Sequence, residues 1–294
     1  MPIIPLYRDF FRFLDGCRGA QDPWERYQEV YVRRQARFFQ AYWDCFRGIS
    51  SDMIAQRVRA IKAEDYGHLR SLIHEQNPER LAREALERCQ GEIPLRPEPP
   101  VYLFVGFFGP DGMTIDMEGE AAIVMELERF RDFKDLSLLI AHEYGHCLQR
   151  SLLPEEEKGE AKTLIQKIQS EGLAVLFSQA VHPEIPIHRH LFLTRERYGW
   201  CRENREALLD LAGGDLGSPK LIPVLFGPGD PVGGIPPRVG YFLAREMLLQ
   251  CGKHHAEEAG GEARRGFFDL LSRLLRKKTP GAERAFPPPG RGAQ

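Results

Sequence analysis

Several stretches of the chain repeat apolar residues at the three- and four-residue spacing of an amphipathic helix. The first, residues 23–47, starts at Pro23 and carries aromatic side chains along one face. The second follows Asn77, a helix-capping residue, and Pro78, which the first helical turn tolerates, and it stops near Gly91. These signals predict that the first ninety residues are mostly helical. The aromatic face comprises Trp24, Tyr27, Tyr31, Phe38, Tyr42 and Phe46.

Three more helices are predicted further along the chain. Residues 135–149 contain no proline and place apolar residues at helical spacing, with Asp132 or Asp135 as the expected N-terminal cap. Residues 159–178 carry a second apolar face of the same period. A last helix is expected over residues 238–250.

Short β stretches and irregular segments lie between these helices. Residues 92–100 hold four prolines in nine positions and are expected to join two parts of the chain. Residues 101–105 resemble a buried strand, and residues 121–127 form a second. Residues 213–237 contain 13 glycines or prolines among 25 positions, which predicts a long loop. The pattern therefore indicates an α+β fold, mostly helical, with a small mixed or antiparallel sheet.

The composition of the chain limits the classes of partner that it is expected to bind and indicates the cellular compartment in which it is expected. The 294 residues carry a formal net charge of −2, which argues against binding nucleic acid through a basic surface. The longest apolar run, residues 101–109, is too short to span a bilayer, and the first residues do not resemble a signal peptide. The six cysteines show no CxxC spacing, so we expect reduced thiols and a cytoplasmic location.

The predicted helix 135–149 contains the chain's most specific motif, His142-Glu143-Tyr144-Gly145-His146. Residues four apart project from the same side of a helix, so His142 and His146 can hold one ion. Glu143 lies about 100° further round, where it can reach a water molecule without ligating the metal. Two imidazoles and an adjacent carboxylate suit hydrolysis assisted by Zn²⁺.

A third ligand is expected from another part of the chain, because catalytic zinc usually keeps three protein ligands and one open position. The chain has Gln149 and Leu152 where metzincins carry glycine and histidine, so that arrangement is excluded. Glu171 lies on or beside the apolar face of the predicted helix 159–178, where an unpaired carboxylate would be costly. Coordination to a cation would remove that cost, so Glu171 is the predicted third ligand.

The motif followed by Glu171, within Glu-Gly-Leu-Ala, resembles the gluzincin group of zinc metallopeptidases. More narrowly, it is similar to the YjaZ-like family of predicted Zn-dependent proteases, and the segment from Phe226 to Tyr241 resembles that family's FG…P…GY pattern. This resemblance covers roughly residues 100–250. It implies a zincin-like fold and hydrolysis of a peptide or protein substrate. One departure is Val175, where some gluzincins place an aspartate that orients the first histidine.

The resemblance also bears on two further roles. Tyr241, at the start of the predicted helix 238–250, is the candidate donor to the oxyanion of a tetrahedral intermediate. In zincins the edge strand before the active helix pairs with extended substrate, and residues 121–127 occupy that position in the chain. Ala122 and Val124 are accordingly the predicted substrate-binding positions. The chain is expected to divide into three regions. These are a helical region 1–91, a zincin-like metallopeptidase domain 92–277 and a disordered tail 278–294.

Several alternatives stay open at this point. Arginines among the aromatic residues of 23–47 could form a nucleic-acid or membrane surface, although packing on the core is the favoured interpretation. His188 and His190 would share a face if they lay in a strand and could bind a second metal, but a solvated loop is favoured. Cys147 is expected to pack rather than coordinate. The whole site could also belong to a non-catalytic peptide-binding module or to a structural zinc protein.

Overall fold

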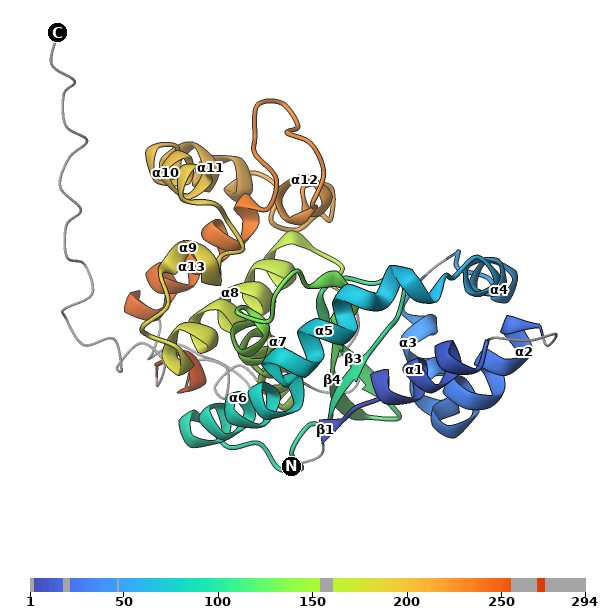
Figure 1. Ribbon diagram of the computed structural model, residues 1–294. Coiled ribbons are helices and arrows are strands. Elements are labelled where there is room, and N and C mark those ends of the chain that lie inside the picture. Colours follow the sequence, from blue (N-terminus) through green and yellow to red (C-terminus); the bar gives the residue numbers. More distant parts are fainter. Residues whose placement is uncertain (1–2, 18–21, 47, 154–160, 255–268, 273–294) are drawn as a thin grey trace, which may run out of the picture.

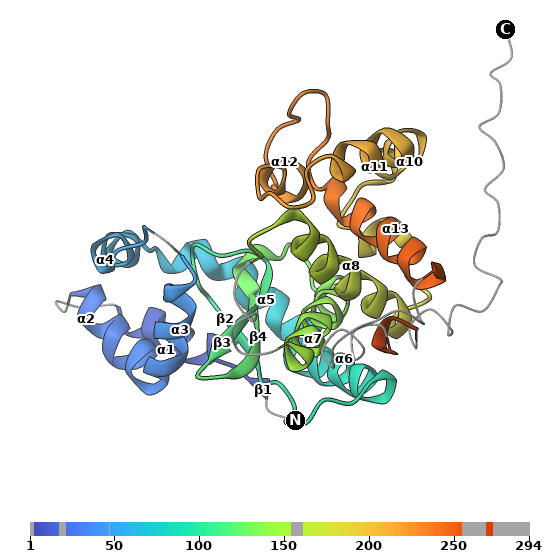
Figure 2. The ribbon, with the colours of Figure 1, turned by 180° about the vertical axis from the view of Figure 1, so that it is seen from behind.

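The computed structural model describes residues 3–17, 22–46, 48–153, 161–254 and 269–272. A small sheet lies between two groups of helices, with helices α1 to α4 on one side and helices α6 to α8 on the other (Figures 1 and 2). The predicted α+β fold, mostly helical with a small mixed sheet, is confirmed. The predicted tail 278–294 lies outside the described residues.

The sheet has the strand order β1-β2-β4-β3. Strand β2 pairs in parallel with both β1 and β4, while β3 and β4 form an antiparallel hairpin. Glu118 and Gly119 close that hairpin with φ angles of 57° and 91°, the left-handed conformation of a two-residue turn. The strands are β1 (Ile3–Ile4), β2 (Val101–Phe104), β3 (Gly112–Met117) and β4 (Glu120–Glu126).

The prediction that residues 121–127 form the edge strand is wrong. Strand β4 covers residues 120–126, and Leu127 begins a 3₁₀ turn. Because β4 lies between β2 and β3, the edge strands of the sheet are β1 and β3. Ala122 and Val124 are each 1% exposed, and both pair with residues of β3, while Val124 also pairs with Tyr102 of β2. They are therefore not free to pair with a substrate. The β3 segment contains Gly112 and Asp116, which depress β propensity and hide the strand from pattern analysis.

The aromatic stripe of residues 23–47 packs on the core, as predicted, and Phe38 and Tyr42 lie against one face of the sheet. Phe38 stacks on Tyr102 of β2 with ring centroids 4.2 Å apart, and Tyr42 meets Phe104 edge-on. The stretch is not one continuous helix, because a π-helical turn and a 3₁₀ turn interrupt it. Its elements are α2 (Pro23–Tyr27), the π-helical turn Gln28–Val32, the 3₁₀ turn Arg33–Gln35 and α3 (Ala36–Asp44), flanked by α1 (Tyr7–Gly16) and α4 (Ser51–Arg59).

Helices α5 (Gly67–Gln76) and α6 (Pro78–Glu92) lead to the opposite face of the sheet. The predicted Asn77 cap is confirmed, because its side-chain oxygen accepts a hydrogen bond from the backbone N–H of Arg80 at 3.1 Å. Helix α7 (Leu136–Leu152) then packs against α6, β3 and β4. Asp135 does not cap α7 with its side chain, since it pairs with Arg189 instead.

Small residues bring α7, α8 (Leu164–Val181) and α13 (Val239–His254) close together. A Cβ atom on Gly145 of α7 would lie 2.7 Å from Cα of Ala174 in α8. A Cβ atom on Gly172 would likewise lie 2.7 Å from the carbonyl oxygen of Ala244 in α13. Helix α8 thus packs closely against α7 on one side and against α13 on another. The side chains at the contact between α7 and α8 therefore lie in the interior.

The helices between α8 and α13 are α9 (Ile187–His190), α10 (Arg195–Glu203), α11 (Arg205–Gly213) and α12 (Ile222–Phe226). Helices α10, α11 and α12 pack against α13, and the short helix α9 packs against α8 (Figure 1). The predicted loop 213–237 is irregular for most of its length but contains the one-turn helix α12. None of the described helices combines the length and the hydrophobicity that crossing a membrane requires. Two further 3₁₀ turns cover Ala63–Tyr66 and Leu127–Arg129.

Candidate metal centre

His142, His146 and Glu171 converge between helices α7 and α8. Their candidate ligand atoms all lie within 4.8 Å of one another. Nε2 of His142 is 3.1 Å from Oε2 of Glu171, and Nε2 of His146 is 3.5 Å from the same oxygen. The helical repeat puts both imidazoles on one side of α7, and the close approach of α8 supplies the carboxylate. The arrangement matches the predicted ligand set.

Within the buried cluster, groups of opposite charge stabilise each other's ionised forms. Burial alone would raise the pKa of Glu171, but the positive charges of His146 and Lys167 outweigh it and hold that pKa well below its usual value. Burial alone would lower the pKa of His146, and the negative charge of Glu171 outweighs it and raises that pKa. A buried carboxylate that stays ionised is what a divalent cation requires of its ligand.

The second ring nitrogens of the two histidines have different surroundings. Nδ1 of His146 lies 3.1 Å from Oγ of Ser170. Nδ1 of His142 is buried and has no hydrogen-bond partner among the described residues. Val175 is fully buried at the position where some gluzincins carry an aspartate. A hydroxyl therefore orients one imidazole, whereas the other is held by packing against the ring of Phe192, whose centroid lies 4.9 Å away.

Glu143 is 5% exposed and faces strand β3. The hydroxyl of Thr114 lies 2.9 Å from Oε2 of Glu143 and 3.0 Å from its backbone oxygen. Thr114 was not among the predicted site residues, because it belongs to a strand that the hydrophobic pattern does not reveal. Its role depends on the packing of β3 against α7, for which the sequence holds no local signal.

Tyr241 lies in an aromatic cluster beside the two histidines. Its ring centroid is 6.1 Å from that of His142, 5.1 Å from that of Phe192 and 5.5 Å from that of Phe226. Burial and the negative charge of Glu171 raise the pKa of the phenol, so it stays protonated and can donate a hydrogen bond. The structure thus brings the ring of Tyr241 next to that of His142.

Comparison with known families agrees with this geometry. The sequence profile of the family described as predicted Zn-dependent protease (DUF2268) matches residues 111–259, slightly more than half of the chain. The chain belongs to this family. The match includes the HExxH helix, Glu171 and Tyr241. No curated protein and no solved structure matches the chain.

His188 and His190, the two histidines considered for a second metal site, are not part of the ligand cluster. His188 and His190 belong to helix α9, where residues two apart point in different directions, so they do not share the face that a strand would give them. The favoured expectation of a solvated loop is also wrong, because both lie in a helix and His190 is buried. His190 is 1% exposed, and its Nδ1 lies 2.9 Å from Oγ of Ser178. Burial lowers its pKa to about 4, so the ring is neutral at physiological pH. Neither histidine is grouped with the candidate metal ligands.

Cys147 packs in the interior, as predicted. Burial raises the pKa of its thiol to about 12, with the charge of Glu143 adding to the effect. A neutral thiol is a poor metal ligand, and Cys147 is not part of the ligand cluster. All six cysteines are described and none forms a disulfide, which agrees with the expectation of free thiols.

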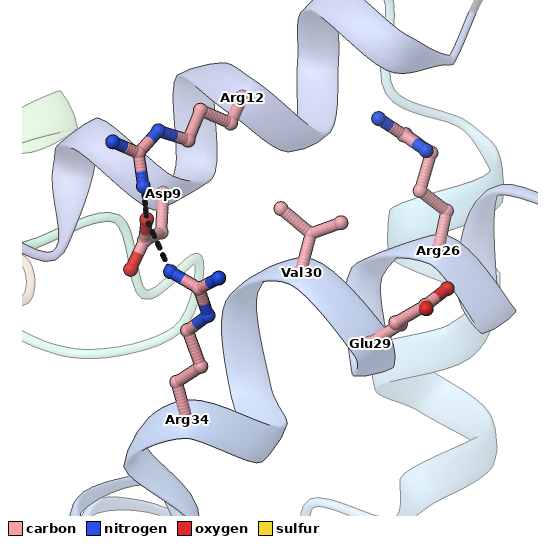
Figure 3. A pocket seen from close by; sticks show the side chains of 6 residues that line it. All are labelled: Asp9, Arg12, Arg26, Glu29, Val30 and Arg34. Atoms are coloured by element: carbon pink, nitrogen blue, oxygen red, sulfur yellow. Dashed lines mark hydrogen bonds and ion pairs between the residues drawn. The ribbon is translucent and has the colours of Figure 1, made fainter.

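A separate cavity of about 310 Å³ lies among the N-terminal helices (Figure 3). Asp9 pairs there with Arg12 at 2.7 Å and approaches Arg34 at 4.0 Å, so its carboxylate is already engaged. None of the lining residues is a histidine, cysteine or hydroxyl-bearing residue, so the cavity offers no zinc ligand set. The lining residues are Asp9, Arg12, Arg26, Glu29, Val30 and Arg34.

Proposed function

We propose that this protein is a zinc-dependent peptidase that hydrolyses peptide bonds with Glu143 as general base. The observation that carries the proposal is the convergence of His142, His146 and Glu171 beside a second, separately held carboxylate, that of Glu143.

The donor set fits zinc. Two imidazole nitrogens and one carboxylate oxygen are a common set for catalytic zinc, which leaves one position open. Among the described residues, no fourth histidine, cysteine, aspartate or glutamate joins the group, which argues against a closed structural site. When bound, the ion would act as a Lewis acid that makes water more acidic and polarises a carbonyl group.

Glu143 is the group that moves the proton. Its buried carboxylate would accept a proton from the attacking water and pass it to the leaving amine. Thr114 supports this role because its hydroxyl holds Oε2 and thereby leaves the other oxygen of Glu143 to receive the proton. A base fixed in one orientation loses less entropy during the reaction than a mobile one.

Tyr241 would stabilise the negative charge that develops on the carbonyl oxygen of the substrate. A neutral phenol in a water-poor, aromatic setting is a strong donor toward a developing oxyanion. Tyr241 lies beside His142 and is held by Phe192 and Phe226, so its position next to the candidate metal ligands supports the role.

Strand β3 is the proposed binding edge for an extended peptide. The backbone N–H of Glu126 donates to the carbonyl of Asp111 at 3.1 Å, which makes this a hydrogen-bonded pair of the β3–β4 ladder. Such pairs alternate along an antiparallel ladder, so the backbone groups of Gly112, Thr114 and Asp116 point away from β4. Backbone pairing there would accept peptides of many sequences. Thr114 would then contact the base through its side chain and the substrate through its backbone.

The test compares Glu143→Gln with the wild type. We expect the variant to keep its zinc and to bind peptide, but to lose several orders of magnitude in turnover. Zinc content is measured by elemental analysis and hydrolysis by mass spectrometry of a mixed peptide library. Turnover by the variant equal to that of the wild type would rule out Glu143 as base. Peptide binding without hydrolysis by the wild type would instead favour a peptide-binding module.

A further inference from the structure

The two oxygens of Glu171 have different partners. Oε2 faces the two imidazoles, at 3.1 Å from Nε2 of His142 and 3.5 Å from Nε2 of His146. Oε1 accepts a hydrogen bond from Nζ of Lys167 at 2.6 Å. One oxygen is therefore directed at the candidate metal position, while the other is occupied by a charge-assisted hydrogen bond.

Lys167 is itself held in place from two sides. It lies one helical turn before Glu171 on α8, the spacing at which two side chains meet on a helix surface. Its ammonium also lies 5.7 Å from the ring centroid of Phe226, within the range of a cation–π contact. The side chain of Lys167 is 30% exposed and that of Glu171 is 5% exposed, so their hydrogen bond is largely shielded from water.

We propose that Lys167 is a positioning residue that keeps Oε1 of Glu171 out of metal coordination. The inference rests on the proposed metal centre. A glutamate can ligate a metal through one oxygen or through both, and the second mode fills an additional coordination position. Because Lys167 engages Oε1, Glu171 offers one oxygen only, and the remaining position stays available to the reactants.

The arrangement also has an electrostatic consequence. The ammonium of Lys167 and the metal ion carry charges of the same sign and share one carboxylate. Lys167 therefore opposes metal binding while it shapes the site. Its removal should strengthen metal binding, which is the reverse of what the loss of an ordinary supporting contact would do.

The test uses Lys167→Met, which keeps the length of the side chain but removes its charge. Lys167→Arg keeps a cationic donor, and Lys162→Met is the matched control, since Lys162 is an exposed lysine just before the same helix. Each protein is loaded with Co²⁺, whose visible spectrum reports the coordination number. Zinc affinity is measured by competition with a chelator, and thermal unfolding verifies that each variant is folded.

We expect the Co²⁺ absorption of Lys167→Met to weaken and shift to shorter wavelength, as both oxygens of Glu171 enter the coordination sphere. Zinc affinity should rise roughly 10-fold, the order expected for loss of one nearby like charge. Lys167→Arg and Lys162→Met should match the wild type in both measurements.

Two results would overturn the inference. A stronger affinity with an unchanged spectrum would mean that Lys167 only neutralises Glu171 until the metal binds. A weaker affinity would mean that Lys167 helps to build the site rather than restricting it. His142→Ala separates this inference from the proposed function, because metal binding that survives that substitution would reject the metal centre itself.

Discussion

The hydroxyl of Thr114 lies 2.9 Å from the carboxylate of Glu143, a residue 29 positions later in the chain. The same hydroxyl lies 3.0 Å from the backbone oxygen of Glu143. Because a threonine hydroxyl has a single proton, it can donate to only one of these two oxygens at a time. Strand β3 and helix α7 are thus linked at the residue that we propose as the base.

Replacing Thr114 by valine, which has nearly the same shape, should lower kcat about 10-fold. The variant loses one hydrogen bond to a charged group, an effect of about 1.5 kcal/mol or more. Thr114→Ser keeps the hydroxyl and is the matched control, with kcat close to that of the wild type. Zinc content should be the same in all three proteins. An unchanged kcat in Thr114→Val would show that Glu143 needs no support from β3.

Tyr241→Phe should lower kcat by roughly 10- to 1000-fold with little change in KM, because in the proposed mechanism the phenol would act only on the developing oxyanion. Its zinc content should stay at the wild-type level, since the phenol is not a proposed ligand. Steady-state kinetics on one defined peptide measures both constants. A rise in KM at constant kcat would instead assign Tyr241 to substrate binding.

Glu171→Ala should lower the zinc content markedly, because the site would lose one of three ligands. The purified wild type should carry about one zinc ion per chain. Glu184→Ala is a suitable control, since Glu184 is exposed and pairs with Arg88 away from the cluster. Full zinc occupancy and full activity in Glu171→Ala would exclude it as the third ligand.

The raised pKa of the buried Glu126 carboxyl group makes the free energy of unfolding depend on pH. Burial, reinforced by the charge of Glu128, raises the pKa of Glu126 from 4.5 to about 8. Between these two pH values the folded protein retains a proton that the unfolded chain releases, so the free energy of unfolding falls as pH rises through this window. The loss is about 1.4 kcal/mol per pH unit for each such group.

Glu126→Gln should flatten this dependence, because an amide does not titrate and still offers an oxygen to the hydroxyl of Tyr42. Urea unfolding at pH 5 and pH 8 gives the two free energies. The variant should be more stable than the wild type at pH 8. Glu118→Gln, at a side chain that is 72% exposed, should behave like the wild type. The same slope in Glu126→Gln and in the wild type would contradict the prediction.

The sequence was most informative where the chemistry is local. His142 and His146 are one helical turn apart, so their shared direction follows from the helix alone. Glu171 could be identified because a carboxylate beside an apolar helix face needs a partner. Thr114 and Lys167 could not, since a threonine in a weak strand and a lysine on a half-exposed helix face are ordinary residues until the packing is known.

The sheet was harder to predict than the helices. Strands β2 and β4 are runs of apolar residues and stand out, whereas β3 mixes glycine, threonine and aspartate. The order of strands depends on which of them pair, and pairing is a long-range property that no local pattern encodes. The prediction that β4 lies at the edge was wrong because only β2 and β4 have a strong apolar signal, so β3 was not predicted.

Strand β1 pairs with β2, and β2 pairs with β4, yet β1 and β2 both precede residue 111, where the family match begins. Anyone who cut the gene at the boundaries of that match would discard half of the strands. Strand β4 would then present an open apolar edge, Ile123-Val124-Met125, which is prone to aggregate. Expression of this protein, and of relatives built in the same way, should therefore include the N-terminal residues.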